Sequence, residues 1–385
     1  MISLITIVAF LLASIWVAKA ESAVESGPIT IRADGSIDPP TAPIQREGNY
    51  YTLTADIVTD TDGIIVEASN IMFDGDGHLI QGNGTGTGIL LLPDLVNETS
   101  LDNVTVKSTE ITNFENGMYM PGVLPASGDF ITISGNKMMG NHVDLHLDAF
   151  LYSTICGNSL GSRDSLTGEY FGYNDVYENN MSRVYSDYGL SDNVFHGNNI
   201  AQIALAYAGG NVFYENNITL KGAYGDGCGV ILNAACETFY KNNIRDNLIG
   251  VLIGFHSQNT YFYNNNFINN TEQVRFGGEV GPVGWNGNYT IGGNYWDSYA
   301  GVDVKSGPYQ NLTGSDGIGD TAYFLGISYP ECNYSDNYPL MHPVDWTDTA
   351  QIPEFPSFVF PLLFMIATLL AVIICKRKCF GFLKG

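Results

Sequence analysis

The densest run of possible metal ligands in the chain is the segment Asn141-His-Val-Asp-Leu-His-Leu-Asp148. If this segment is a β-strand, its valine and leucines face inward and its polar residues face outward, because side chains alternate along a strand. The outward set is then His142, Asp144, His146 and Asp148. Imidazole with carboxylate suits a divalent transition metal. The two histidines would lie about 13 Å apart, so a site would need Asp144 with one of them. The alternative is a solvated polar face.

A second set of oxygen ligands lies on glycine-rich turns near the C-terminus. It comprises Asp297, Asp303, Asp316 and Asp320. Carboxylates and main-chain carbonyls on such turns are the ligands that calcium prefers, although the spacing differs from an EF-hand loop. Aspartate also shapes turns through its own hydrogen bonds, without any metal. The sequence therefore supports a calcium site and a purely structural interpretation.

Tyrosines recur at one position of a repeated motif, and aromatic faces can stack on sugar rings. These residues are Tyr177, Tyr214, Tyr240 and Tyr263. The same recurrence would build a ladder of rings that stiffens a sheet. Both interpretations stay open at this stage.

Catalytic motifs are missing from the sequence. A glycosidase needs two carboxylates across the bond that it cleaves, and a lyase needs a positioned base. The chain has many carboxylates but no compact aspartate pair followed by Gly-His-Gly and Arg-x-Lys. We therefore favour a non-catalytic protein and keep a polysaccharide lyase or glycoside hydrolase as the alternative.

The element that must position these residues is a repeat. Asparagines recur at intervals of 22, 22, 19, 18, 26 and 23 residues, namely at Asn136, Asn158, Asn180, Asn199, Asn217, Asn243 and Asn266. A period near 22 indicates units that must stack to bury their apolar faces. Asparagine tolerates tight bends, and stacked amides can hydrogen-bond in a ladder. We predict that these asparagines are buried in such a ladder.

Apolar residues keep the same register. The residue four positions before the asparagine is apolar in the last five copies: Val176, Phe195, Phe213, Phe239 and Phe262. Short aromatic and β-branched runs between Asn and Gly turns are typical of strands, and no copy has helical spacing. Strand, turn and strand without a helix predict an all-β parallel β-helix, with these residues inside.

The composition limits the class of partner. The chain has 385 residues, 45% of them apolar, and a formal net charge of −24. A solenoid of this length can bury a long core because it grows by whole rungs. The acidic charge excludes a nucleic-acid partner, which requires a basic face.

The two ends of the chain are apolar. Residues 1–20 end in Ala-Lys-Ala and match a secretory signal peptide. A charge-free run at 357–375 is followed by the basic tail 376–385, which predicts one transmembrane helix with its C-terminal end in the cytoplasm. Between them we expect an N-terminal lead at 21–50, β-helix rungs at 51–288, a C-terminal cap at 289–345 and a linker at 346–356.

Three motifs carry a resemblance to a known family. The asparagine-rich rungs, together with GNYWDSYAGVD, GSDGIGD and DNYPLM, resemble the NosD-type β-helix family, which is often labelled periplasmic copper-binding. Similar rungs occur in carbohydrate-binding and sugar-hydrolase β-helices. The resemblance implies a right-handed coil and, as a further alternative, copper handling. The segment PEFPS before the apolar run resembles archaeal PEF-type surface-sorting signals, which implies anchoring at the cell surface.

The extracytoplasmic setting has chemical consequences. Sequons that could carry N-linked glycans occur at Asn83, Asn97, Asn103, Asn269, Asn288, Asn311 and Asn333. We exclude the sequons at Asn180 and Asn217 because the ladder would bury both. Cys228 and Cys236 are close enough in sequence to form a disulfide. The resulting hypothesis is a surface-anchored β-helix that binds a glycan or forms part of the envelope.

Overall fold

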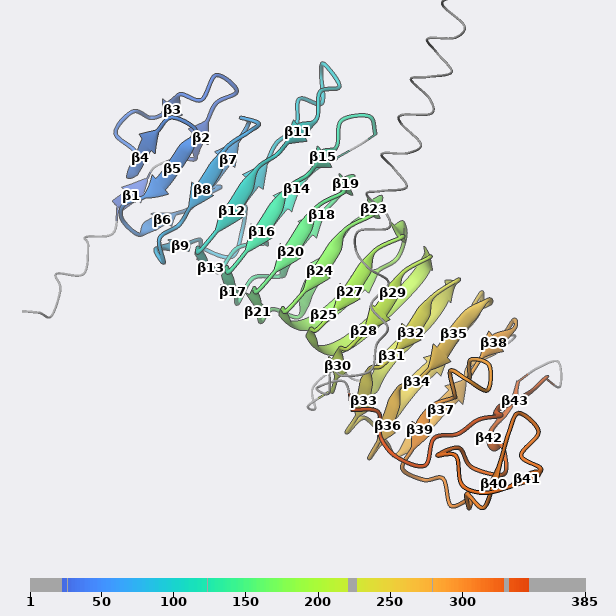
Figure 1. The fold of residues 1–385 in the computed structure, drawn as a ribbon. Helices are drawn as coiled ribbons and strands as arrows, with labels where there is room; N and C mark the ends of the chain where they lie inside the picture. The colour runs from blue at the N-terminus through green and yellow to red at the C-terminus, as the bar shows by residue number, and fades with distance from the viewer. Residues whose placement is uncertain are drawn as a thin grey trace, which may run out of the picture. The chain divides into compact units, whose positions relative to one another are not determined.

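The computed structural model describes residues 23–25, 27–122, 124–220, 227–278, 280–328 and 332–345 (Figure 1). These residues coil into stacked rungs of short parallel strands, as the repeat predicts. The parallel β-helix is therefore confirmed. The proposed signal peptide, the linker from residue 346, the apolar run and the basic tail lie outside the described residues. Within the described part of the chain no helix is long and apolar enough to cross a membrane.

One wall of the coil is a twelve-stranded sheet. Its strands are β4 (Ile44–Glu47), β5 (Tyr50–Leu53), β8 (Met72–Asp74), β12 (Thr105–Lys107), β16 (Thr132–Ser134), β20 (Thr154–Cys156), β24 (Asp175–Tyr177), β27 (Val194–His196), β29 (Val212–Tyr214), β32 (Thr238–Tyr240), β35 (Thr260–Tyr263) and β38 (Val283–Gly284). All neighbours pair in parallel except the β4–β5 hairpin. We call this wall the first sheet.

The remaining walls belong to a 27-stranded sheet that wraps around the coil. Its long strands are β7 (Ile64–Val66), β10 (Thr87–Leu91), β14 (Asn116–Met120), β18 (Val143–Leu147), β22 (Asp164–Thr167), β25 (Asn180–Ser186), β28 (Asn199–Gly209), β31 (Cys228–Ala235), β34 (Ile249–Ile253) and β37 (Glu272–Phe276). Short strands precede them: β6 (Ile57–Thr59), β9 (Leu79–Gln81), β13 (Glu110–Thr112), β17 (Lys137–Met139), β21 (Ser159–Leu160), β30 (Asn217–Ile218), β33 (Asn243–Arg245), β36 (Asn266–Ile268) and β39 (Tyr295–Trp296). Others follow them: β11 (Leu101–Asp102), β15 (Gly128–Asp129), β19 (Phe150–Leu151), β23 (Phe171–Gly172) and β26 (Leu190–Ser191).

Both ends of the coil deviate from this pattern. At the start, β1 (Ala23–Glu25) and β2 (Ile29–Ile31) pair in parallel with β6 and β7, and β3 (Ile37–Asp38) pairs back on β2. The coil thus begins inside the segment that was expected to precede it. At the other end, two antiparallel hairpins follow β39, made of β40 (Lys305–Ser306) with β41 (Leu312–Thr313) and β42 (Tyr323–Ser328) with β43 (Cys332–Asp336).

The core contains a column of aromatic rings in the predicted register. Val176, Phe195, Phe213, Phe239 and Phe262 occupy equivalent positions in successive strands of the first sheet, and all are fully buried. Ring centroids of successive phenylalanines are 4.6–4.8 Å apart, and Trp285 continues the stack at 4.6 Å. Parallel, in-register pairing of identical residues places each ring directly over the next.

The asparagine ladder exists, but most of its predicted members were wrong by one residue. The buried amides are Asn136, Asn158, Asn179, Asn198, Asn216, Asn242, Asn265 and Asn294. Each member after Asn136 accepts the main-chain N–H and the side-chain N–H of the preceding member, at 2.9–3.1 Å. Asn136 and Asn158 were predicted correctly.

The second asparagine of each later doublet begins the next short strand and lies outside the ladder. Asn180 and Asn199 are exposed, and Asn217 and Asn243 are half-buried. Asn266 is buried as predicted, but it bonds to Asn243 rather than to a member of the ladder. The exclusion of Asn180 and Asn217 as glycan acceptors rested on burial in the ladder, and that reason was wrong. The last ladder amide, Asn294, donates its main-chain N–H to the buried carboxylate of Asp336 at 2.7 Å.

A second, shorter ladder runs along another corner and ends on a carboxylate. Asn174, Asn193 and Asn211 bond in sequence, and Asn211 donates its main-chain and side-chain N–H to Glu237 at 3.1 and 3.2 Å. Glu237 is fully buried. Burial raises the pKa of Glu237 from 4.5 to about 8. At a pH between these two values, the Glu237 carboxyl is protonated in the folded protein and ionised in the unfolded chain.

This buried proton predicts a pH-dependent stability. The contribution of Glu237 to the free energy of unfolding is fully present below its unfolded pKa of 4.5 and is lost as the pH rises to about 8. In that window the Glu237 carboxyl is ionised only in the unfolded chain. Glu237→Gln should remove this contribution, since a glutamine oxygen can accept both Asn211 bonds as the asparagines do. We expect the melting temperature of the wild type to fall more steeply than that of the variant between pH 5 and pH 8.5. Parallel curves would contradict the buried proton.

Candidate functional site

The predicted transition-metal residues do not share one face. Asp144 lies in β18 but is fully buried, and its carboxylate accepts the main-chain N–H of Ser162 at 2.8 Å and Asn141 Nδ2 at 3.0 Å. Burial raises the pKa of this carboxyl group. In the preceding rung, Gly117 occupies the position equivalent to Asp144. A Cβ added to Gly117 would lie 3.0 Å from Asn141 Nδ2, so a side chain at this position points toward the corner residue Asn141. The side chain thus points into the corner of the coil, and its predicted outward position was wrong.

The other residues of that run are dispersed. His142 is exposed, whereas His146 packs against the Tyr119 ring and approaches Asp148 with Nε2 3.5 Å from Oδ1. In the part of the chain that the structure describes, no three His, Cys, Asp or Glu side chains are grouped so that they could hold a metal ion. These residues therefore do not fit copper.

The four C-terminal aspartates bond the cap's own polypeptide. Asp303 accepts from Ser315, Asp316 and Gly317, and the hydrogen bond from Ser315 lowers its pKa. Asp316 accepts from Tyr289 and Gly307, Asp320 from Val304 and Lys305, and Asp297 from Asn269 and Gln273. Their oxygens hold turns together, which is the structural interpretation of this set.

The recurring tyrosines form a ladder on the outer face of the first sheet, with His196 inserted. Successive ring centroids from Tyr177 through His196, Tyr214 and Tyr240 to Tyr263 are 4.9–5.5 Å apart, and the planes lie within 13° of each other. Rings stacked in this way cover one another's faces and leave edges and hydroxyls to solvent. Sugar stacking needs an open face, so this ladder is a poor sugar platform. Burial raises the pKa of Tyr240 to about 12, which keeps its hydroxyl protonated.

The predicted disulfide is excluded by strand geometry. Cys228 opens β31 and Cys236 follows its last residue. Eight extended residues span about 26 Å, whereas bridged Cα atoms lie within about 7 Å. The predicted sequon asparagines with a described side chain are all exposed: Asn83, Asn97, Asn103, Asn269, Asn288 and Asn311. The side chain of Asn333 lies outside the described residues.

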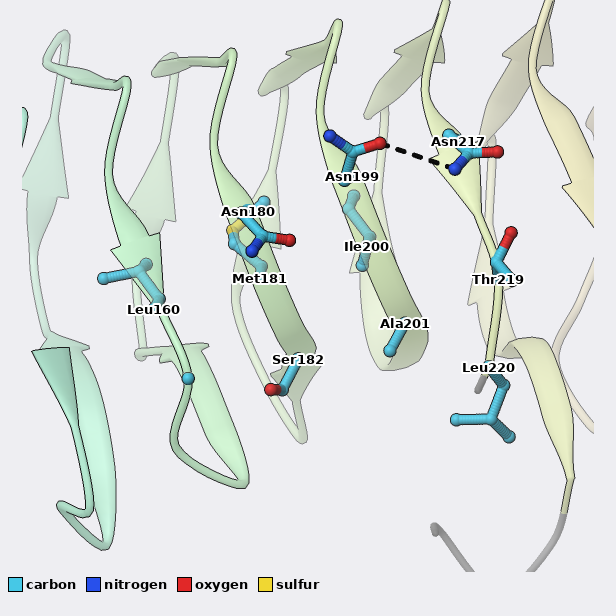
Figure 2. A pocket seen from close by; sticks show the side chains of 11 residues that line it. Leu160, Asn180, Met181, Ser182, Asn199, Ile200, Ala201, Asn217, Thr219 and Leu220 are labelled. Carbon is cyan, nitrogen blue, oxygen red and sulfur yellow. Dashed lines mark hydrogen bonds between the residues drawn. The ribbon is translucent and has the colours of Figure 1, made fainter. Parts of the chain in front are cut away.

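The structure adds a hollow that no sequence motif indicated. In most rungs a turn separates the short strand from the long strand, as between β21 and β22. In two successive rungs the turn is missing and a single strand runs through, as β25 and β28. A hollow of about 440 Å³ lies at this place. It is lined by Leu160, Gly161, Asn180, Met181, Ser182, Asn199, Ile200, Ala201, Asn217, Thr219 and Leu220 (Figure 2).

Polar groups in this hollow are left without partners. Asn180, Asn199 and Asn217 lie in register across neighbouring strands, and Asn217 donates to Asn199 at 3.4 Å (Figure 2). Asn217 Oδ1 and Thr219 Oγ1 are buried and make no hydrogen bond with any described residue. Thr219 is only 8% exposed. Buried polar atoms are nearly always bonded, so unpartnered ones beside a hollow are candidate contacts for a polar ligand.

A second hollow of about 230 Å³ lies farther along the same two strands. Here the lining includes Ala204 and Ala206 of the middle strand, β28. Tyr185 and Asp187 lie on the side of the preceding rung, and Ile231 and Asn233 on the side of the next rung. Because alanine ends at Cβ, the two alanines leave a gap in an otherwise filled row. Tyr185 is unlike the ladder tyrosines, since its partner in the next rung is Ala204 rather than a ring.

The signal for this region was present in the spacing. The two shortest ladder steps, of 19 and 18 residues, are the rungs of β25 and β28. A short rung must omit a turn. From the sequence these intervals were given only as steps of the repeat, and Tyr185, Thr219 and the three asparagines were not identified as residues that line hollows.

A comparison with family models decides the family. The model described as "Periplasmic copper-binding protein (NosD)" matches residues 44–301, which is more than half of the chain. The chain belongs to the NosD family. The NosD match includes the GNYWD motif and ends before GSDGIGD and DNYPLM. The copper in the family's description has no matching ligand cluster among the described residues of this member.

Two further comparisons add little to the NosD assignment. A search of curated proteins gives no match. Among solved structures, endopolygalacturonase I from Stereum purpureum, determined with two galacturonate molecules, is similar over 70% of this chain and 96% of its own. The identity is 12% and the TM-score is 0.31.

Proposed function

We propose that the protein binds a glycan without cleaving it, in the hollow over β25 and β28. The observation that carries this proposal is the pair of unpartnered buried atoms, Asn217 Oδ1 and Thr219 Oγ1. A sugar hydroxyl both donates and accepts, so it can satisfy a carbonyl oxygen and a neighbouring hydroxyl together. The exposed amides of Asn180 and Asn199 supply further donors and acceptors along the same strip.

The lining of this hollow favours binding over catalysis. A glycoside hydrolase needs two carboxylates at the scissile bond. The described lining residues of the first hollow include no aspartate or glutamate. A polysaccharide lyase or hydrolase is therefore the alternative that an activity assay must decide, and copper handling lacks a ligand cluster in the described residues.

The proposed location is the outer surface of the cell envelope. The family's description places NosD proteins in the periplasm, outside the cytoplasm. We further propose that residues 1–20 are removed as a signal peptide, that residues 357–375 anchor the protein in the membrane as a PEF-type surface signal would, and that the coil is right-handed. The exposed sequons at Asn83, Asn97, Asn103, Asn269, Asn288 and Asn311 are compatible with a surface location.

Removal of one hydroxyl tests the proposal. A glycan array selects the oligosaccharide, and calorimetry then measures its Kd. Thr219→Val keeps the shape and deletes the buried hydroxyl, so we expect Kd to rise about tenfold, the effect of one lost hydrogen bond. Thr238→Val, on the outer face of the first sheet, is the matched control and should leave Kd unchanged.

Two results would overturn the proposal. Equal affinities for Thr219→Val and Thr238→Val would place binding elsewhere. Steady release of reducing ends or unsaturated products from the selected glycan would make the protein an enzyme.

A further inference from the structure

The second hollow contains a cation whose charge is already neutralised. Arg183 of β25 lines this hollow, and its Nε is 2.9 Å from Asp164 Oδ1 on the preceding rung. Both side chains are largely buried, at 15% and 17% exposure. The guanidinium also lies 4.1 Å from the centre of the Tyr185 ring. An ion pair held against an aromatic face has little freedom to turn toward a ligand.

The neighbouring acid remains accessible. Asp187 lines the second hollow and is exposed. It accepts a hydrogen bond from the Tyr185 hydroxyl, which raises the pKa of that phenol. Among the described residues that line the two hollows, Arg183 is the one cation and no lysine occurs. A ligand carboxylate placed there would meet Asp187, while the one cation of the lining, Arg183, is already paired with Asp164. The net charge of −24 adds a repulsive field at longer range.

Tyr185 gives this hollow a sugar-binding character. The Arg183 guanidinium lies over one face of this ring, so a pyranose ring in the gap above Ala204 would contact the ring's edge or its other face. Asn233 and Asp187 provide polar groups at the rim. The first hollow continues along the same strands from Ser182 and Ala201. One oligosaccharide lying along β25 and β28 would thus pass from the amide-lined hollow to the one beside Tyr185.

We infer that the hollow beside Tyr185 is a second sugar subsite that selects neutral or cationic sugars, such as amino sugars, and rejects uronic acids. This inference rests on the proposed glycan binding. It assigns Asp187 as the residue that determines charge specificity. Like charges in partly desolvated sites discriminate strongly against the wrong ligand.

Matched pairs of probes test the charge selection. The first pair is an oligogalacturonate and its fully methyl-esterified form, which share a backbone and differ in charge. The second is a glucosamine hexamer and its N-acetylated form. Calorimetry on the full-length protein should show the methyl ester binding at least about tenfold more tightly than the free acid, and glucosamine at least as tightly as its N-acetylated form.

Variants and salt locate the effect. Asp187→Asn should reduce the preference for the ester over the acid several-fold, whereas Glu178→Gln, which removes an exposed charge elsewhere on the same rung, should preserve it. Higher salt should also reduce the preference, because it screens exposed charges. Tyr185→Ala should weaken all the probes that bind.

Each outcome has a separate meaning. If the free uronate binds as tightly as its ester, or if Asp187→Asn leaves the preference intact, the charge selection is wrong while glycan binding stands. If neither these probes nor any glycan on the array binds, the proposed function fails, and the subsite fails with it.

Discussion

The Phe239→Asp variant is expected to lose the folded coil at room temperature. Phe239 is fully buried and stacks on Phe213 and Phe262 at 4.6 and 4.8 Å. Removing a buried phenylalanine costs about 3–5 kcal/mol, and burying an unpaired carboxylate costs several more. The sum is comparable to the whole stability of a typical protein, about 5–15 kcal/mol.

The neighbouring residue provides a matched control. Thr238 precedes Phe239 on β32 and is half-buried on the outer face of the sheet. Thr238→Asp adds the same charge one residue away, and we expect it to cost about 1 kcal/mol or less. Circular dichroism and thermal melting of both variants check the prediction. A Phe239→Asp protein that melts with the wild type would show that the inward register is wrong.

The Asn198→Ala variant is expected to destabilise the coil by about 3 kcal/mol. The Asn198 amide accepts the main-chain N–H of Asn179 at 2.9 Å and donates to the carbonyl of Val176 at 2.8 Å. Alanine leaves both of these buried groups without partners, and each unsatisfied group costs about 1–3 kcal/mol. Chemical denaturation should show an earlier midpoint.

Asn199 is the control that the sequence itself supplies. It follows Asn198 directly, is exposed, and bonds through its side chain to Asn217 at 3.4 Å. Asn199→Ala should change the free energy of unfolding by about 0.5 kcal/mol or less, as surface substitutions usually do. If the two variants were equally unstable, the assignment of ladder and surface residues within each doublet would be wrong.

These doublets show what the sequence can and cannot predict. The phenylalanine column followed from spacing because parallel rungs in register place one residue type over the same type. The choice between Asn198 and Asn199 did not follow, since both fit the period and differ only in which one turns inward at the corner. A one-residue shift along a strand moves every side chain to the other face.

The candidate sites depended on contacts between rungs, and here sequence reasoning was weaker. Alternation placed Asp144 outside, but the corner beside β18 encloses its side chain, as Asn141 and Ser162 show. Tyr177 and Tyr214 were correctly aligned, yet stacking on His196 covers the faces that a sugar would need. The hollows arise from a missing turn and two alanines. Neither forms a recognisable sequence motif, so motif analysis did not find the hollows.

The asparagine ladder also bears on how this molecule avoids becoming a fibre. Each amide both accepts and donates, so a pile of identical rungs has no inherent last member, and an open edge invites another chain to add on. Asp336 breaks that symmetry, because a carboxylate accepts the N–H of Asn294 but has no amide N–H to pass on. The hairpin of β42 and β43, which contains Asp336, therefore ends the asparagine ladder within one chain. A second copy of the chain would find no free amide N–H at this end of the ladder.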